Sequence, residues 1–208
     1  MKQPPLLDVD VTARHDEDFY RTPIWQTRVL FDRVNRHWGG FVVEPCVGDG
    51  AIVAQIPDGL DVLTNDLVVR EPMVPEYRLD ARLPETWRRF AAVGRLDVVV
   101  TNPPFDVAFD IAQHALEACH VGLALLLRLS WLEPTEDPRD LSKARGPWLA
   151  AHPPTRLIVM PRYDYRGNGK TDSVTSAWMV WAKRPDFCQP GVEVVTKAER
   201  DALERRAP

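Results

Sequence analysis

The sequence predicts an α/β fold with a mainly parallel sheet covered by helices on both faces. Apolar, strand-like runs alternate with helical patterns or long loops along the 208 residues, which is the order that parallel sheets require. Several of these runs are apolar throughout rather than alternating, as expected for strands buried on both faces. A hydrophobic content of 45% is enough for the core of one domain.

The first elements follow a Pro- and Asp-rich segment at residues 1–18, whose composition predicts loose order. A helix is expected to begin with Thr22 as its cap and Pro23 in its first position, and to end at Gly39 and Gly40. A further helix is expected at 106–120. Strands are predicted at 41–45, 61–67, 77–81 (the weakest) and 96–104 (the strongest).

The second half begins with an almost continuously apolar run at 121–131, which we place in the middle of the sheet. Residues 133–155 form a polar, Pro-rich insertion with one short helix. Strands at 156–161 and 176–183 are joined by a Gly-rich loop rather than a helix, so they can be antiparallel. These elements make one domain, residues 19–195, and a capping box at Thr196 and Glu199 predicts a C-terminal helix within 196–208.

The composition excludes several classes of protein. The three cysteines, Cys46, Cys119 and Cys188, lack metal-ligand spacing, which argues for a reducing compartment and against disulfides or zinc. The N-terminus lacks the apolar core of a signal peptide. The longest apolar run is too short for a bilayer and contains Arg128. We therefore expect a soluble cytoplasmic protein without a metal or a membrane partner.

Charge is unevenly distributed along the chain. The net charge is −4, yet residues 139–170 contain seven Lys or Arg against two acidic residues. This excess is either an ordinary solvated surface or a basic face for a polyanion such as nucleic acid. Charge patterning alone leaves both interpretations open.

The end of the first strand has the composition of a ligand loop. Ligands of parallel sheets bind at the carboxyl ends of strands, and here Glu44 and Pro45 are followed by Gly48-Asp49-Gly50. Glycines let a backbone approach a ligand closely, and a helix start beyond them offers free N–H groups. The loop is not a phosphate loop, because no Gly-Lys-Ser/Thr follows.

The ends of the next two predicted strands carry acidic residues. Asp66 can accept hydrogen bonds from both hydroxyls of a ribose, and Asp80-Ala81 suits an adenine amino group. Together with the glycine loop they predict a nucleoside cofactor. Because the longer glycine motif of dinucleotide sites is missing, an adenosine with a short charged tail fits better, which describes S-adenosylmethionine.

The strongest strand ends on Asn102-Pro103-Pro104-Phe105. The prolines restrict the backbone, so the side-chain oxygen of Asn102 and the carbonyl of Pro103 can be directed at one point. Two acceptors at one point suit an –NH2 group, and holding both hydrogens favours a pyramidal nitrogen whose lone pair is free to attack. Phe105 offers a face on which a base can stack.

At these residues the sequence resembles the class I S-adenosylmethionine-dependent amino-methyltransferases, most closely the N6-adenine methyltransferases and their small phage and bacterial DNA members. Asn102-Pro103-Pro104-Phe105 matches the family's catalytic motif, and residues 44–50 look like its cofactor motif, with Glu44 where Asp is more usual. The resemblance implies a Rossmann-like methyltransferase sheet, mostly parallel with an antiparallel last strand. It also implies that Tyr20, Thr22 and Pro23 belong to the segment that closes over the methionine part of the cofactor, and it places Asn102 beside the cofactor.

The resemblance implies site-specific methylation of the N6 of adenine in DNA, after the base is flipped out of the duplex. Many such enzymes have a separate recognition domain, for which this chain has no room. We therefore expect recognition by substrate-side loops at 134–152 and 162–174, or by a partner, either a second copy or a recognition subunit. The candidate backbone contacts are Arg139, Lys143, Arg145, Arg162, Arg166 and Lys170.

Three alternatives remain open. An RNA N6-adenine methyltransferase fits because the motif does not distinguish the two sugars. A protein glutamine N5-methyltransferase solves the same chemical problem, although its motif usually ends in Tyr. The third alternative is a catalytically silent partner subunit that still binds the cofactor.

Overall fold

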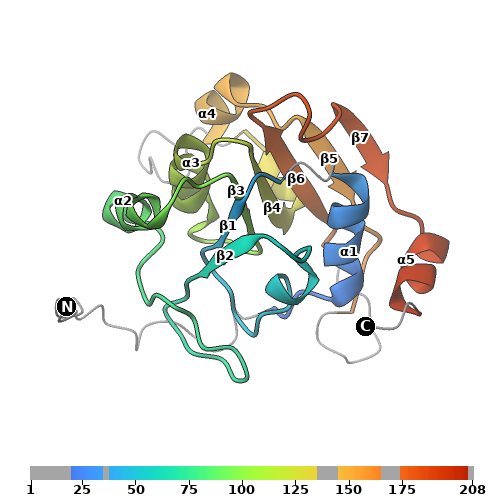
Figure 1. Cartoon of the computed structure of the whole chain (residues 1–208). Helices are drawn as coiled ribbons and strands as arrows, with labels where there is room; N and C mark the ends of the chain where they lie inside the picture. The colour runs from blue at the N-terminus through green and yellow to red at the C-terminus, as the bar shows by residue number, and fades with distance from the viewer. Residues whose placement is uncertain (1–19, 35–37, 135–144, 165–173, 206–208) are drawn as a thin grey trace.

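A computed structural model describes residues 20–34, 38–134, 145–164 and 174–205 of the chain. Within these residues seven strands form one sheet in the order β2-β1-β3-β4-β6-β5-β7 (Figure 1). The sheet explains the apolar runs of the sequence, since its central strands β3 and β4 are buried along almost their whole length. The strands are β1 Phe41–Glu44, β2 Asp61–Thr64, β3 Val98–Thr101, β4 Gly122–Arg128, β5 Arg156–Val159, β6 Ser176–Ala182 and β7 Gly191–Val194.

The pairing of the strands confirms the predicted mixed sheet. Strands β1 to β4 are parallel, and β6 is antiparallel to both of its neighbours, β4 and β5. The expectation that the antiparallel strand is the last one is wrong. The chain adds β7, which pairs in parallel with β5 at the sheet edge. Its short sequence Gly-Val-Glu-Val is largely exposed, so it lacks the apolar run by which the other strands are predicted.

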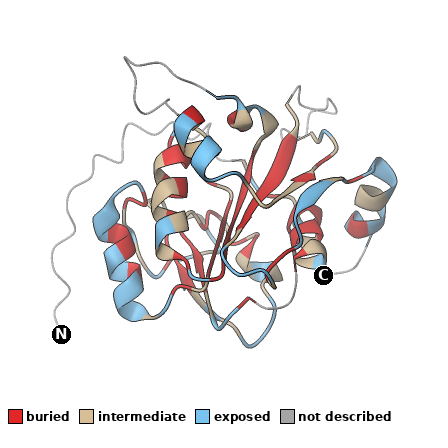
Figure 2. Ribbon diagram, turned by 90° about the horizontal axis from the view of Figure 1, so that it is seen from above, coloured by how far each residue is buried: buried red, intermediate tan, exposed pale blue. Residues whose placement is uncertain are grey.

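Helices cover both faces of the sheet. One face packs against α1 (Ile24–Arg33) and α5 (Lys197–Glu204), and the other against α2 (Pro84–Val93), α3 (Ala108–Ala118) and α4 (Arg145–Ala151). Figure 2 shows the resulting core, with the central strands buried, the helices buried mainly on their inner sides and β7 largely exposed at the edge. The α4 and α5 helices were predicted, and the capping box of Thr196 and Glu199 is formed.

Three local predictions are wrong, and one helix was not predicted. The first helix begins at Ile24 with Pro23 as its N-cap, and it ends at Arg33 before the glycines. Residues 77–81 are not a strand, because only Tyr77 pairs, in an isolated bridge with Asn65. The helix expected after Gly50 is a single 3-10 turn, η3 (Val53–Gln55). Helix α2 was not predicted, although Pro84 at its first position is a typical start signal.

Two kinds of feature are absent from the described residues. None of their helices is long and apolar enough to cross a membrane. They also contain no group of three or more His, Cys, Asp or Glu side chains placed to hold a metal ion.

Candidate active site

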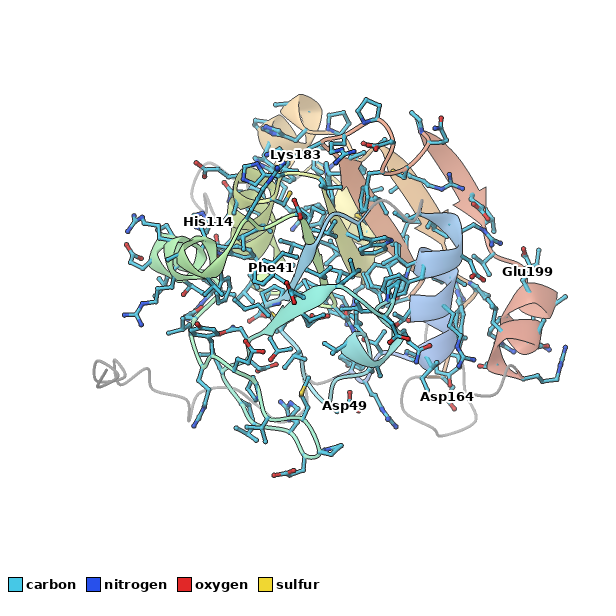
Figure 3. All side chains as sticks on the ribbon, in the orientation of Figure 1. Phe41, Asp49, His114, Asp164, Lys183 and Glu199 are labelled. Carbon is cyan, nitrogen blue, oxygen red and sulfur yellow. The ribbon has the colours of Figure 1, made fainter. Side chains whose placement is uncertain are left out.

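The carboxyl ends of β1 to β4 share one edge of the sheet, as parallel pairing requires. In Figure 3, Asp49 of the glycine loop marks this edge at the bottom of the view, and Lys183, which follows antiparallel β6, lies at the opposite edge. The predicted site residues Glu44, Asp66 and Asn102 all follow or end strands at this edge. Topology therefore brings together residues that are up to 58 positions apart in the chain.

The glycine loop is held against the end of β2 by Asp66. The Oδ2 atom of Asp66 accepts a hydrogen bond from the backbone N–H of Gly48 at 2.9 Å, and its Oδ1 atom accepts one from Val68 N–H at 3.0 Å. Gly48 and Gly50 have φ values of 55° and 85°, which residues other than glycine rarely adopt. Asp66 thus shapes the loop and keeps free lone pairs for a ligand hydroxyl.

Glu44, the last residue of β1, is completely buried. Neither of its carboxyl oxygens has a hydrogen-bond partner among the described residues. Burial raises the pKa of this carboxyl well above its ordinary value, the adjacent Thr101 hydroxyl opposes the shift, and the charge of Asp66 adds to it. A raised pKa favours the neutral acid, so this buried carboxyl beside the glycine loop would bind a cationic group only in its ionised form, which such a group would itself stabilise.

Asp80 and Ala81 are buried in a turn that leads into α2. The turn is fixed because the Asp80 carbonyl accepts from the Thr86 hydroxyl at 2.6 Å and the Ala81 carbonyl from Trp87 Nε1 at 2.8 Å. The Asp80 carboxylate is held by Arg82, whose Nε and Nη2 donate to it at distances between 2.5 and 2.9 Å. The hydrogen bond to Asp80 raises the pKa of Arg82, against a smaller opposing effect of burial. Sequence reasoning missed Arg82.

The side-chain amide of Asn102 has a fixed orientation. Its Nδ2 donates to the backbone carbonyl of Tyr20 at 3.2 Å and to the hydroxyl of Thr22 at 3.0 Å. Both hydrogens of the amide are thereby used, so its Oδ1 faces a different direction and has no donor among the described residues. Thr22 was expected to cap α1. Its hydroxyl instead accepts the hydrogen bond from Asn102 Nδ2, and α1 begins without a side-chain cap.

The other residues of the Asn-Pro-Pro-Phe motif also make specific contacts. The Pro104 carbonyl accepts from Val107 N–H at 3.3 Å, whereas no described donor binds the carbonyl of Pro103. The ring of Phe105 contacts two side chains, with the Tyr20 ring centroid at 6.3 Å and the guanidinium carbon of Arg128 at 4.3 Å from its own centroid. Arg128 lies at the end of β4 beside the candidate site. From the sequence it was noted only as a charged residue within an apolar run, not as a site residue.

The segment before α1 closes over the glycine loop. Arg21 Nε lies 2.6 Å from the Asp49 carboxylate, and the Pro23 carbonyl accepts from Gln26 N–H. Trp25 is buried beneath the segment and packs against Tyr163, with ring centroids 5.7 Å apart. Residues 20–22 therefore contact both the Asn-Pro-Pro-Phe motif and the glycine loop.

Two of the six predicted basic contacts lie in the described residues. The guanidinium carbon of Arg145, on α4, lies 5.4 Å from the Trp131 ring centroid, and burial lowers its pKa against an opposing effect of Glu133. Arg162 is exposed, next to the Tyr163 that packs on Trp25. Neither contacts Asn102 or Phe105 through a hydrogen bond, ion pair or ring contact. Arg139, Lys143, Arg166 and Lys170 lie outside the described residues.

Comparison with known proteins matches no family model and no curated protein. Solved structures do match. A methyltransferase subunit of the type I restriction-modification system from Streptococcus thermophilus has a TM-score of 0.57 and 13% identity over 88% of this chain and 51% of its own. A modification subunit assigned to a type I restriction enzyme of Vibrio vulnificus YJ016 has a TM-score of 0.56 and 13% identity over 91% of this chain and 53% of its own.

A Listeria monocytogenes protein assigned to the class I S-adenosylmethionine-dependent methyltransferases is similar over 93% of this chain and 74% of its own, with a TM-score of 0.55 and 12% identity. The chain thus spans about half the length of the two restriction-modification subunits. At such identities the likeness concerns the fold. The predicted fold class is confirmed: the chain has the Rossmann-like α/β fold of class I methyltransferases.

Proposed function

We propose that this protein is an S-adenosylmethionine-dependent methyltransferase that acts on the N6 amino group of adenine in DNA. The observation that carries the proposal is the fixed amide of Asn102. Because Nδ2 is held by Tyr20 and Thr22, Oδ1 and the neighbouring Pro103 carbonyl are left as acceptors at the carboxyl end of β3. Two acceptors beside an aromatic ring suit an exocyclic amine on a flat base.

The chain's own groups would activate this amine. With both hydrogens of N6 held by Asn102 Oδ1 and Pro103 O, the nitrogen lone pair is drawn out of conjugation with the ring and directed to the methyl donor. Bound S-adenosylmethionine would supply a methyl group on a positively charged sulfur, so that an N6–C bond could form while the S–C electron pair stays on sulfur. N6 then loses one proton to solvent. Catalysis is therefore largely positioning.

The residues of the site fit this cofactor. Asp66 keeps lone pairs for the ribose hydroxyls beyond those used by Gly48 and Val68, and the buried turn at Asp80 and Ala81 suits the adenine edge. The carboxyl of Glu44 makes no hydrogen bond to the described residues, and in its ionised form it would accept hydrogen bonds from the cationic methionine end. Three fold neighbours described as methyltransferases or modification subunits support the same choice.

The test is incubation of wild type and Asn102→Ala with S-adenosylmethionine and, separately, duplex DNA, single-stranded DNA and RNA, followed by digestion to nucleosides and mass spectrometry. We expect N6-methyldeoxyadenosine from the wild type and a loss of at least about a hundredfold in the variant, since oriented hydrogen-bonding groups contribute this much to catalysis. Urea unfolding of the variant, compared with that of the wild type, controls for its folding.

Other outcomes identify other functions. N6-methyladenosine from RNA alone would move the protein to the RNA enzymes. No methylated base, with the cofactor bound, would overturn the nucleic-acid proposal and point to protein glutamine or a silent partner subunit. Methylation of DNA without sequence preference would indicate that recognition is supplied by a partner, as the type I subunits that resemble this chain suggest.

A further inference from the structure

Arg128 is one of several arginines whose guanidinium has no acidic partner among the described residues, and it is the one that contacts the Asn-Pro-Pro-Phe motif. Within the described residues, Arg33, Arg82, Arg156 and Arg200 each bind at least one carboxylate. Arg128 makes no ion pair or hydrogen bond there, although its residue is partly buried at the end of a strand of six buried residues. A guanidinium carries five N–H donors, so an unpaired one in a partly buried position is costly unless a ligand uses it.

The register of the sheet places this charge at the candidate active site. Leu125 of β4 pairs with Thr101 of β3, so Arg128 lies three residues beyond this pair and Phe105 four residues beyond it, in the same direction. The guanidinium carbon is 4.3 Å from the centroid of the Phe105 ring, over its face. This distance is within the range of cation–π contacts.

The contact with Phe105 is made without any hydrogen bond from Arg128 to the described residues. A guanidinium whose flat surface lies on an aromatic face keeps its N–H groups in its own plane, where they point away from the ring. They form the fork that binds a phosphate through two parallel hydrogen bonds. The contact with Phe105 therefore leaves the N–H donors of Arg128 available for an anion. The Phe105 ring also lies near Tyr20.

An open recess begins at the residue that follows Arg128 in the chain. It has a volume of ≈ 650 Å³, lies between the residues that follow β4 and those that precede β6, and includes Leu129, Ser130 and Thr175. This volume is in the range of small-molecule sites. Within the described residues, the only charged residue that lines the recess is the acid Glu133, so a phosphate at this end of β4 would depend on the guanidinium of Arg128.

We propose that Arg128 binds the phosphodiester group next to the target adenine with the edge of its guanidinium while its face holds the Phe105 ring. The proposal rests on the proposed function, because it requires a nucleic-acid substrate. Arg128 is then a substrate-binding residue that links the position of the nucleic-acid backbone to that of the Phe105 ring. It was not among the predicted basic contacts.

The test measures equilibrium binding of a fluorescent oligonucleotide at about 50 to 200 mM salt, where phosphate contacts show their salt dependence. The proteins are wild type, Arg128→Gln, Arg128→Lys and the control Arg88→Gln, which removes a charge from the exposed face of α2. We expect Arg128→Gln to weaken binding about tenfold and to reduce the slope of log Kd against log salt by about 0.9 for duplex DNA or 0.7 for a single strand. Arg128→Lys should keep the slope, and Arg88→Gln should resemble wild type.

The outcomes separate this proposal from the proposed function. An unchanged slope in Arg128→Gln, with adenine methylation by the wild type, would overturn the role of Arg128 and leave the function standing. A reduced slope without methylation of any base by the wild type would support the phosphate contact and overturn the function. A loss of slope in Arg88→Gln equal to that in Arg128→Gln would also contradict the proposal, since it would show a general effect of charge. Calorimetric binding of S-adenosylmethionine shows that each variant is folded.

Discussion

The amide of Asn102 shows how one side chain depends on a distant segment. Its orientation is set by Tyr20 and Thr22, about eighty positions earlier in the chain. The motif itself could be recognised from the sequence, because two prolines after a buried strand are uncommon and chemically informative. The two groups that orient the amide could not, since Thr22 has the sequence signature of a helix cap.

Replacing Thr22 by Val should therefore lower kcat by about three- to tenfold, the effect of about one hydrogen bond. The KM for the nucleic acid should change little, because Thr22 orients Asn102 rather than binding the substrate backbone. Steady-state kinetics on a methylated-product assay measures both constants. Thr22→Ser keeps the hydroxyl and should retain most of the activity; equal losses in Thr22→Ser and Thr22→Val would contradict this role.

Glu44 gives a prediction about pH. Its pKa in the folded protein is raised, mainly by burial, so its contribution to stability is fully present below the ordinary Glu pKa and is lost as the pH rises through the folded value. Glu44→Gln removes this titration. The variant should gain stability relative to wild type as the pH increases, by at most about 1.4 kcal/mol per pH unit within that window.

Urea unfolding of wild type and Glu44→Gln between about pH 5 and 9 measures this difference, and Glu85→Gln on the exposed side of α2 is the control. A constant difference between Glu44→Gln and wild type at all pH values would show that the carboxyl of Glu44 does not titrate with a raised pKa.

At the scale of elements, the sequence predicted best where packing repeats a regular pattern. The apolar runs of β3, β4 and β6 and the capping box of α5 are such patterns, and the structure contains each of them. Exposed β7 was missed because its valines lie on the surface, with Val192 71% and Val194 66% exposed. What places it is pairing with β5, together with Glu193, which bonds Arg33 and Arg156.

Residues 77–81 show the opposite error. Their alternation suggested a strand, but Asn65 takes over the hydrogen bonds that a neighbouring strand would make: its Oδ1 accepts from Leu79 N–H at 2.9 Å, and its Nδ2 donates to the carbonyls of Leu79 and Pro45. The segment therefore reaches the strand ends as a loop. The prediction of Asp80 as a site residue was based on the end of that strand, and in the structure a buried turn takes the place of the strand end.

For the whole molecule, parallel pairing collects the strand ends at one edge, and this explains why site residues could be predicted without coordinates. Topological order makes Glu44, Asp66 and Asn102 neighbours once the strands are known to be parallel. What topology does not contain is the pairing of individual side chains. Three such contacts each involve the long side chain of an arginine whose position carries no periodic signal: Arg21 with Asp49, Arg82 with Asp80 and Arg128 with Phe105.

Cofactor binding should therefore stabilise the whole domain through the loop that Asp66 holds. At a free concentration about a hundred times its Kd, a ligand adds about 2.7 kcal/mol to the stability of the folded state, which corresponds to a rise in Tm of about 5–10 °C for a domain of this size. S-adenosylmethionine should produce this rise in the wild type. Asp66→Ala should lose most of it, because the variant removes both the acceptor for the ribose and the tether of Gly48. Asp61→Ala, at the exposed opposite end of β2, should respond like wild type in the same thermal-shift measurement, and an equal rise in Asp66→Ala would exclude the ribose contact.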